Sequence, residues 1–331
     1  MPLHDTSYQH WEGVHLGLWR RRWVIARAGL RACLQGKWMR HLIVLCWVSA
    51  LGMTTVLFLV GQLLVANSIV VKWMGNFNPA LQAFAGMLTT WLEQHPEISV
   101  RTTQDVLFYY FCIGLMRAGI FALGMAIPLL ITRDLASNAI IIYSSKAVSR
   151  GDYLLGKFIT AFVLIFLTWL GPVCAAWFVG NLLAPDWRFF WHSRVAVAHV
   201  LVFGAASMTV LSLLALGVSA ISSKEKSTAA VWFMWWIFGG VLAPIAVQTQ
   251  PWLRHLSFNF DLDQLALAVF RPAHDLTIAQ TNIPILGDML RGVRPQTLAS
   301  LATPELQGAV AALLVMLALA AFLIRNRVRP E

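Results

Sequence analysis

Residues 133–157 read RDLASNAIIIYSSKAVSRGDYLLGK and are the one long polar interruption in the middle of an otherwise apolar chain. A membrane-length apolar run leads into this stretch and another leads out of it. Ser149, followed three residues later by Asp152 and then by an apolar run, is the pattern of a helix N-cap with its reciprocal acid. A solvated loop between two spans is the simplest interpretation. The apolar run Ala139–Tyr143 indicates more than a solvated loop, because it needs a surface against which it can be buried.

The composition around this stretch is that of an integral membrane protein. The chain has 331 residues, of which 58% are hydrophobic and 12% charged, whereas soluble domains are about 25% charged. A spanning helix needs about 20 mostly apolar residues. We therefore predict an all-α membrane protein with six transmembrane helices. The predicted spans are Leu42–Leu64, Leu107–Thr132, Phe158–Leu183, Val195–Ile221, Ala229–Thr249 and Gly308–Ile324.

The net charge of +10 would suit a nucleic-acid partner, but the placement of the charges indicates a membrane topology instead. If both termini lie inside, 16 of the 25 Lys and Arg fall in the inner segments and eight in the outer segments. This positive-inside bias predicts a cytoplasmic N-terminus and C-terminus, and no nucleic-acid partner is expected. The inner segments are 1–41, 133–157, 222–228 and 325–331, and the outer segments are 65–106, 184–194 and 250–307.

Residues 1–41 are interpreted as an interfacial segment that precedes the membrane domain 42–331. From Leu16 onward, Trp and Leu recur at helical spacing, while Arg20, Arg27 and Arg31 fall on another face. Such a helix lies in the inner membrane interface, in contact with lipid. A helix packed on a soluble partner is the alternative. We expect no signal peptide in this segment.

The outer segment 65–106 is predicted to hold a short amphipathic helix that begins at Asn78 and ends at His95-Pro96. Thr102–Asp105 then has the pattern of a capping box that opens the second span.

The outer segment 250–307 is predicted to hold a helical run, Leu262–Phe270, that stops at Arg271-Pro272, and Thr303–Glu305 is expected to cap the last span. Outer segments of this length suggest an extracytoplasmic partner.

Two patterns bear on cofactors. Gly151–Phe158 reads GDYLLGKF and differs from the phosphate-binding loop G-x-x-x-x-G-K-[ST] at the last position, where the hydroxyl that holds Mg²⁺ is missing. The bulky residues inside it favour a helix start, so any ATP and Mg²⁺ are expected on another chain. The four Cys and nine His show no metal-ligand spacing. We expect no metal site, no bound cofactor and no catalytic residue.

All 15 Asp and Glu lie outside the six predicted spans, where Arg117 and His199 are the ionisable residues. Ion-coupled transporters usually place carboxylates within the bilayer, so energy for transport is expected from outside it. Arg117 lies about 24 Å along a helix from Arg133, which is near the outer boundary and fits snorkelling. A place on a substrate path is the alternative for Arg117.

The stretch Ala147–Lys157, AVSRGDYLLGK, with six spans and both ends inside, resembles type-2 ATP-binding-cassette (ABC) transporter permeases. The most similar branch is bacterial and includes the permease of the nitrous oxide reductase copper-maturation system and the gliding-associated permeases. Its pattern is P-[IV]-S-R-x-[DE]-[YF]-x-x-G-K, and Ala147 stands where the family usually has Pro.

The resemblance implies a multi-pass permease in the bacterial inner membrane, with two permease chains, identical or not, over two ATPase chains that bind ATP and Mg²⁺. Residues 133–157 would hold the coupling helix that docks on the ATPase. Ile141 and Tyr143 are the candidate anchors, and charged neighbours would orient the loop. The residues expected at this contact are Asp134, Ile141, Tyr143, Lys146, Ser149, Arg150 and Asp152.

The resemblance further implies ATP-driven alternating access, most simply for export of a substrate that the sequence does not name. Two other functions stay open at this point: a membrane scaffold of an envelope or motility complex without transport, and a channel or carrier that is independent of ATP. In each of them the chain itself is not an enzyme.

Overall fold

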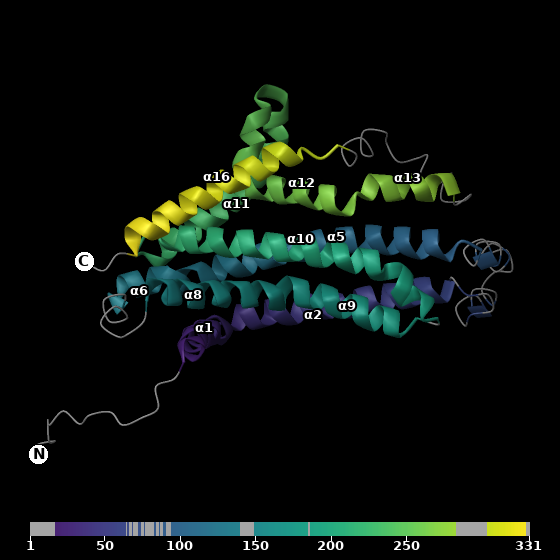
Figure 1. Cartoon of the computed structure of the whole chain (residues 1–331), viewed down its shortest axis with the longest axis horizontal. Coiled ribbons are helices and arrows are strands. Elements are labelled where there is room, and N and C mark those ends of the chain that lie inside the picture. The colour runs from purple at the N-terminus through teal and green to yellow at the C-terminus, as the bar shows by residue number, and fades with distance from the viewer. Residues whose placement is uncertain are drawn as a thin grey trace, which may run out of the picture.

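The computed structural model describes residues 17–63, 94–139, 149–184, 186–282 and 303–328, together with isolated positions between 65 and 90. Every regular element among these residues is a helix. Figure 1 shows that most of the helices run along the long direction of the molecule. These are α2 (Lys37–Leu63), α5 (Pro96–Ile127), α8 (Arg150–Ile165), α9 (Gly171–Leu182), α10 (Arg188–Ser219) and, at a tilt, α16 (Leu306–Arg327).

Shorter or differently directed helices complete the described part. In Figure 1, α1 is seen nearly end-on and so crosses the bundle direction, and α12 and α13 lie along one side of the bundle. These elements are α1 (Leu18–Gln35), α6 (Arg133–Ala136), α11 (Glu225–Thr249), η3 (Pro251–Leu256), α12 (Phe258–Phe270) and α13 (Pro272–Asn282).

Five helical runs in the described part are long and apolar enough to cross a membrane, so the chain is built as a multi-pass membrane protein. They are Lys37–Gln62, Ile98–Ala136, Arg150–Leu182, Arg188–Ser219 and Leu306–Arg327. The remaining predicted span, Ala229–Thr249, lies within the helix α11 but is not one of these five. The count of six spans and the orientation stay predictions.

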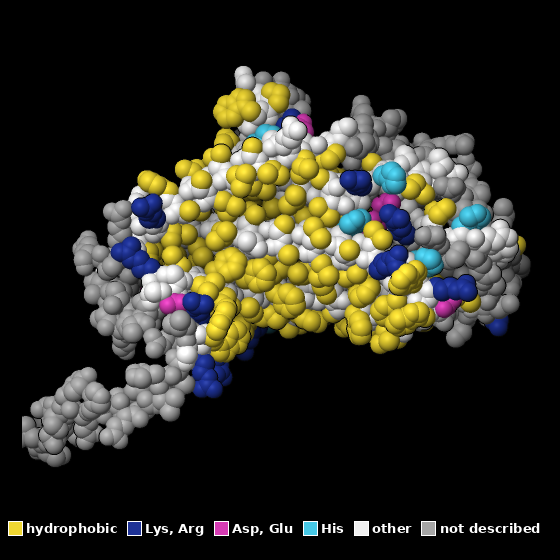
Figure 2. Space-filling view, in the orientation of Figure 1, with side chains coloured by type: hydrophobic (Ala, Val, Ile, Leu, Met, Phe, Trp, Pro, Cys, Tyr) yellow, Lys and Arg dark blue, Asp and Glu magenta, His cyan; other side chains and the backbone are white. Residues whose placement is uncertain are grey.

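The surface has the distribution of side chains that a bilayer favours. Figure 2 shows a broad hydrophobic belt with Lys and Arg at one end and a mixture of His, basic and acidic side chains at the other. Large apolar side chains on α2 and α16, such as Leu51 and Leu314, are exposed. Apolar patches of this extent mark a membrane or partner contact rather than a water-facing surface.

The second predicted span contains a π-helical turn, η1 (Pro128–Thr132), between α5 and α6. Pro128 has no N–H, and a π-turn leaves backbone groups without their usual partners. Ser219 at the end of α10 satisfies them, because its Oγ donates to the Ile127 carbonyl (2.8 Å) and accepts from the N–H groups of Ile131 (2.8 Å) and Thr132 (3.1 Å). This contact joins the C-terminal ends of α5 and α10. A second π-turn, η2 (Phe166–Leu170), precedes Pro172 in the third span.

The core lies where α5, α10 and the α8–α9 run meet. Trp169, Phe203 and Trp232 are fully buried there, and the Trp232 indole N–H donates to the Ile120 carbonyl at 3.0 Å. Each large apolar side chain that is fully buried contributes about 1.5–3 kcal/mol by area, although between helices in lipid the gain comes from packing and polar contacts. This core therefore holds together the helices that carry the two residue clusters described below.

The predicted helix end at His95-Pro96 is confirmed, since Gln94 is helical, His95 is not, and a new helix, α5, begins at Pro96. The structure corrects the predicted start of that next helix, because Thr102–Asp105 lies inside α5 rather than capping it. Proline suits the first helical turn because its fixed φ matches the helix and its missing N–H has no partner there. The rest of the predicted helix from Asn78 falls mostly outside the described residues.

The predicted stop at Arg271-Pro272 is confirmed, since α12 ends at Phe270 and α13 begins at Pro272. Glu305 directly precedes α16 as expected, but no side chain caps that helix.

Candidate functional site

The inner-end cluster consists of Arg22, Asp134, Asp152, Tyr153 and Lys157, and it begins at the predicted N-cap. Ser149 caps α8, because its Oγ accepts from the Asp152 backbone N–H at 3.1 Å. The Ser149 hydroxyl in turn donates to the Asp152 carboxylate at 2.6 Å. The N-cap prediction is thus confirmed. The reciprocal bond goes to the hydroxyl rather than to the backbone.

Asp152 also connects α8 to α1. The Arg22 Nε lies 2.5 Å from the Asp152 carboxylate, and the carboxylate side chain is 9% exposed. An ion pair with this little solvent is sensitive to the loss of either partner. The pair therefore fixes the crossing helix α1 on the first turn of α8.

Asp134 connects α6 to α8 in the same way. Its carboxylate accepts from the Tyr153 hydroxyl at 2.7 Å and pairs with the Lys157 ammonium at 2.7 Å. The Lys157 side chain is 8% exposed and that of Asp134 is 15% exposed. Asp134 and Lys157 are the two ends of the stretch that interrupts the apolar chain, so this pair clamps the stems of the inner loop together.

Gly156 shows why a glycine stands in the middle of α8. A Cβ at this position would lie 2.8 Å from the Ile25 side chain and 3.2 Å from the Arg22 carbonyl oxygen, so α1 and α8 approach closely here. Small residues at helix crossings permit such contact. Gly151–Phe158 belongs to the continuous helix α8, so the resemblance of this stretch to a phosphate-binding loop has a packing explanation.

The predicted docking residues divide into two groups. Asp134, Ser149 and Asp152 are bonded within the chain, and Arg150 is exposed at the start of α8. Ile141, Tyr143 and Lys146 lie outside the described residues. The sequence analysis missed Arg22, Tyr153 and Lys157 as members of the cluster. Tyr153 and Lys157 are four apart and share a helix face, which was the available signal.

Arg117 has a partner that the sequence analysis did not anticipate. Its Nη2 lies 3.0 Å from the Asp263 carboxylate of α12. About half of the Arg117 side chain is exposed. The ion pair gives this charge a partner, while snorkelling and a place on a substrate path both stay predictions.

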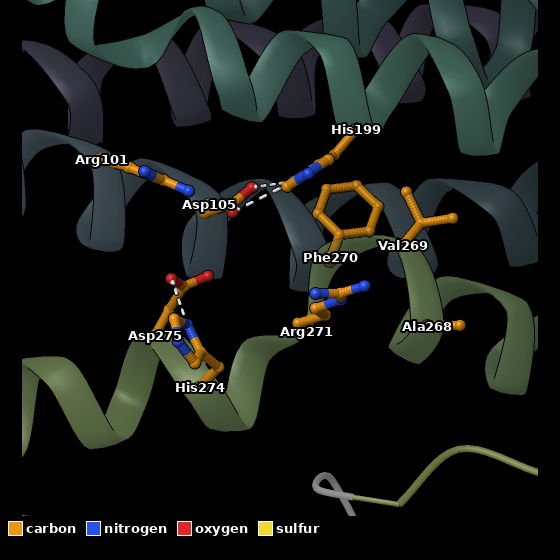
Figure 3. Close-up of a pocket in the computed structure, with 9 residues that line it drawn as sticks. All are labelled: Arg101, Asp105, His199, Ala268, Val269, Phe270, Arg271, His274 and Asp275. Atoms are coloured by element: carbon orange, nitrogen blue, oxygen red, sulfur yellow. Dashed lines mark hydrogen bonds and ion pairs between the residues drawn. The ribbon is translucent and has the colours of Figure 1, made fainter.

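A second cluster, the outer pocket, lies at the end of the molecule opposite to the inner-end cluster (Figure 1). It encloses about 350 Å³, which is within the usual range of ligand pockets. Figure 3 shows side chains from α5, α10 and α13 converging on it. The pocket is lined by Arg101, Asp105, His199, Ala268, Val269, Phe270, Arg271, His274 and Asp275.

The acids of the outer pocket are bonded to one another and to histidines. His199 Nδ1 lies 2.9 Å and 3.1 Å from the two Asp105 oxygens, and the His274 Nδ1 lies 3.8 Å from Asp275. Burial, together with the charge and hydrogen bond of the Asp105 carboxylate, raises the pKa of Asp275 to about 7. Asp275 therefore changes its charge near neutral pH. In the part of the chain that the structure describes, no group of three or more His, Cys, Asp or Glu side chains is arranged to hold a metal.

Comparison with known proteins gives no assignment for either cluster, because no protein-family model and no curated protein matches the chain.

Proposed function

We propose that this chain is the membrane-spanning permease subunit of an ATP-driven transporter, with the inner loop 133–157 as its contact to a separate ATPase. The observation that carries the proposal is the Asp134–Lys157 clamp, which holds the stems of this loop at 2.7 Å. A free cytosolic loop between two spans has no need of a buried ion pair at its base. A loop that receives a mechanical stroke does need one, because motion at its tip must reach the helices.

The contacts provide a route for such a stroke. From the clamp, α6 continues through η1 into α5, and η1 is bonded to Ser219 of α10. On the other side, Asp152 leads through Arg22 to α1. A push on the loop would thus tilt α5 and α8 together and carry α1 with them. In this proposal ATP and Mg²⁺ are bound by the ATPase, a second permease chain completes the transporter, and the substrate is exported.

Replacing Ile141 and Tyr143 together by Asp is expected to abolish co-purification of the ATPase while leaving membrane insertion unchanged. A docking contact depends on a few buried anchors within a polar rim, and carboxylates at the anchors would be desolvated without partners. The measurement is the ATPase recovered with the full-length permease from solubilised membranes. Lys224→Asp and Lys226→Asp on the other short inner loop serve as controls.

A double variant that inserts normally and still carries the ATPase would contradict the docking contact. If the apolar run packs only on the chain's own spans, the double variant will instead be degraded before it reaches the membrane.

The predicted orientation has its own test. A cysteine in place of Ser145, in a variant that lacks the four natural cysteines, is expected to resist an impermeant thiol reagent in intact cells and to react after the cells are opened. The reason is the excess of Lys and Arg in the inner segments. Reaction in intact cells would place the loop outside and contradict both the topology and the proposed ATPase contact.

A further inference from the structure

The outer pocket holds two guanidinium groups that form no ion pair with the acids that the structure describes there, although Arg101 lies near enough to Asp275 to act on its charge. Among the described residues, neither Arg101 nor Arg271 makes a salt bridge or a side-chain hydrogen bond, although both line the cavity. The Asp105 carboxylate is taken by His199, and Asp275 lies against Asp105. Both arginines are exposed, so a solute can reach them. Positive charge thus faces an open cavity without a fixed partner.

The backbone at Arg271 adds a second, independent observation. Arg271 has a φ of 50° and stands in the left-handed region between α12 and α13. Helices that end in this conformation usually place Gly or Asn there, and a longer side chain is held there at a cost. This backbone cost has an explanation if the Arg271 side chain has a function. At this position the guanidinium group points into the pocket beside Phe270 (Figure 3).

We propose that the outer pocket binds a phosphate group through Arg101 and Arg271, with His199 and His274 at its border. The planar fork of a guanidinium matches the oxygens of an oxyanion. Two such groups carry the charge of a doubly charged anion, which favours phosphate over a single carboxylate. The phosphate can belong to a free solute, which can carry both charges, or to the headgroup of an outer-leaflet lipid, a diester with one charge and two free oxygens; both present phosphoryl oxygens to the two guanidinium groups. This inference does not depend on the proposed transport function.

The charges around Asp275 make the expected phosphate binding depend on pH. Asp275 faces Arg101 and Asp105 on α5, His199 on α10, and Arg271 and His274 next to it in the chain. Below about pH 7 Asp275 is protonated and does not repel an anion. As the pH rises through about 7, Asp275 ionises and repels the anion, while inorganic phosphate itself gains its second charge. The effect of Asp275 is therefore measured at each pH as the difference between the unaltered protein and a variant whose side chain stays neutral.

The test uses the full chain in phosphatidylcholine nanodiscs and measures retention of radiolabelled inorganic phosphate. The variants are Arg101→Gln and Arg271→Asn, and the second keeps a residue that tolerates the left-handed backbone. Each is expected to weaken binding about tenfold, the usual effect of removing one charge-assisted contact. Arg188→Gln is the matched control, because Arg188 is also exposed at this end of the molecule but pairs with Asp186 outside the pocket. It should bind as the unaltered protein does.

Two further arms complete the test. Asp275→Asn should bind phosphate more tightly than the unaltered protein at about pH 8 and equally at about pH 6, because its side chain stays neutral. Nanodiscs with phosphatidylglycerol should compete with free phosphate if a lipid headgroup is the source, and should not if the source is a solute. The proposal is overturned if no saturable binding occurs in either lipid, if Arg271→Asn binds normally, or if Asp275→Asn binds no more tightly than the unaltered protein at about pH 8.

Discussion

Lys157→Met is expected to destabilise the protein by about 3–5 kcal/mol, the usual cost of removing one partner from a buried ion pair. The substitution keeps the length and volume of the side chain but leaves the Asp134 carboxylate with the Tyr153 hydroxyl as its remaining contact in the cluster. An uncompensated carboxylate with little access to water accounts for most of the cost. The measurement is the fraction of purified full-length protein that stays folded during a temperature ramp.

A rescue variant distinguishes the contribution of the ion pair to stability from that of apolar packing. Removing the whole cluster in the triple variant Asp134→Leu, Tyr153→Phe, Lys157→Met should recover most of the lost stability, because apolar groups of similar volume often replace a buried pair without loss. Tyr153→Phe is included because its hydroxyl would otherwise lose its acceptor. Lys226→Met, at an exposed inner position, should change the stability by less than about 0.5 kcal/mol.

If Lys157→Met is as stable as the control, the Asp134–Lys157 pair is not a structural clamp, and the route proposed for the stroke loses its first link. If the triple variant stays as unstable as Lys157→Met, packing rather than charge holds the two stems together.

The parts that the sequence predicted correctly are those that depend on neighbours in the chain. Ser149 and Asp152 are three residues apart, so their capping contact is a local signal. The stop at Arg271-Pro272 is local for the same reason. Apolar runs of membrane length are visible in composition alone, and five such helices are present in the described part.

The parts that the sequence did not predict depend on contacts between distant segments. Arg117 and Asp263 are 146 positions apart, and Arg22 and Asp152 are 130 apart. The positions of the two arginines in the sequence do not show which acidic residue will lie next to each of them in the folded chain. The outer pocket likewise joins residues of α5, α10 and α13. Thr102–Asp105 was misread for a different reason, because a capping-box pattern also occurs inside a helix, where the Thr102 hydroxyl donates back to the Ile98 carbonyl.

Gly156 in α8 allows the most direct test of how α1 is held against α8. Gly156→Leu is expected to separate α1 from α8, because any side chain here meets both the Ile25 side chain and the Arg22 backbone. Side chains can rotate away, but the Arg22 carbonyl moves only if the whole helix moves, so the Arg22–Asp152 pair would be lost as well. Overpacking of this kind costs about 1–3 kcal/mol before the ion pair is counted.

The readout is the rate of trypsin cleavage within α1, which carries several arginines and should become accessible when it detaches. Gly151→Leu is the matched control, because it places the same residue in the same helix where the nearest atom to a new Cβ, Ser149 Oγ, is 3.8 Å away. Leucine favours a helix over glycine by about 0.5–1 kcal/mol, so the control should be as resistant as the unaltered protein or more so. Equal cleavage of the two leucine variants would show that α1 is not held by this close contact and needs another anchor.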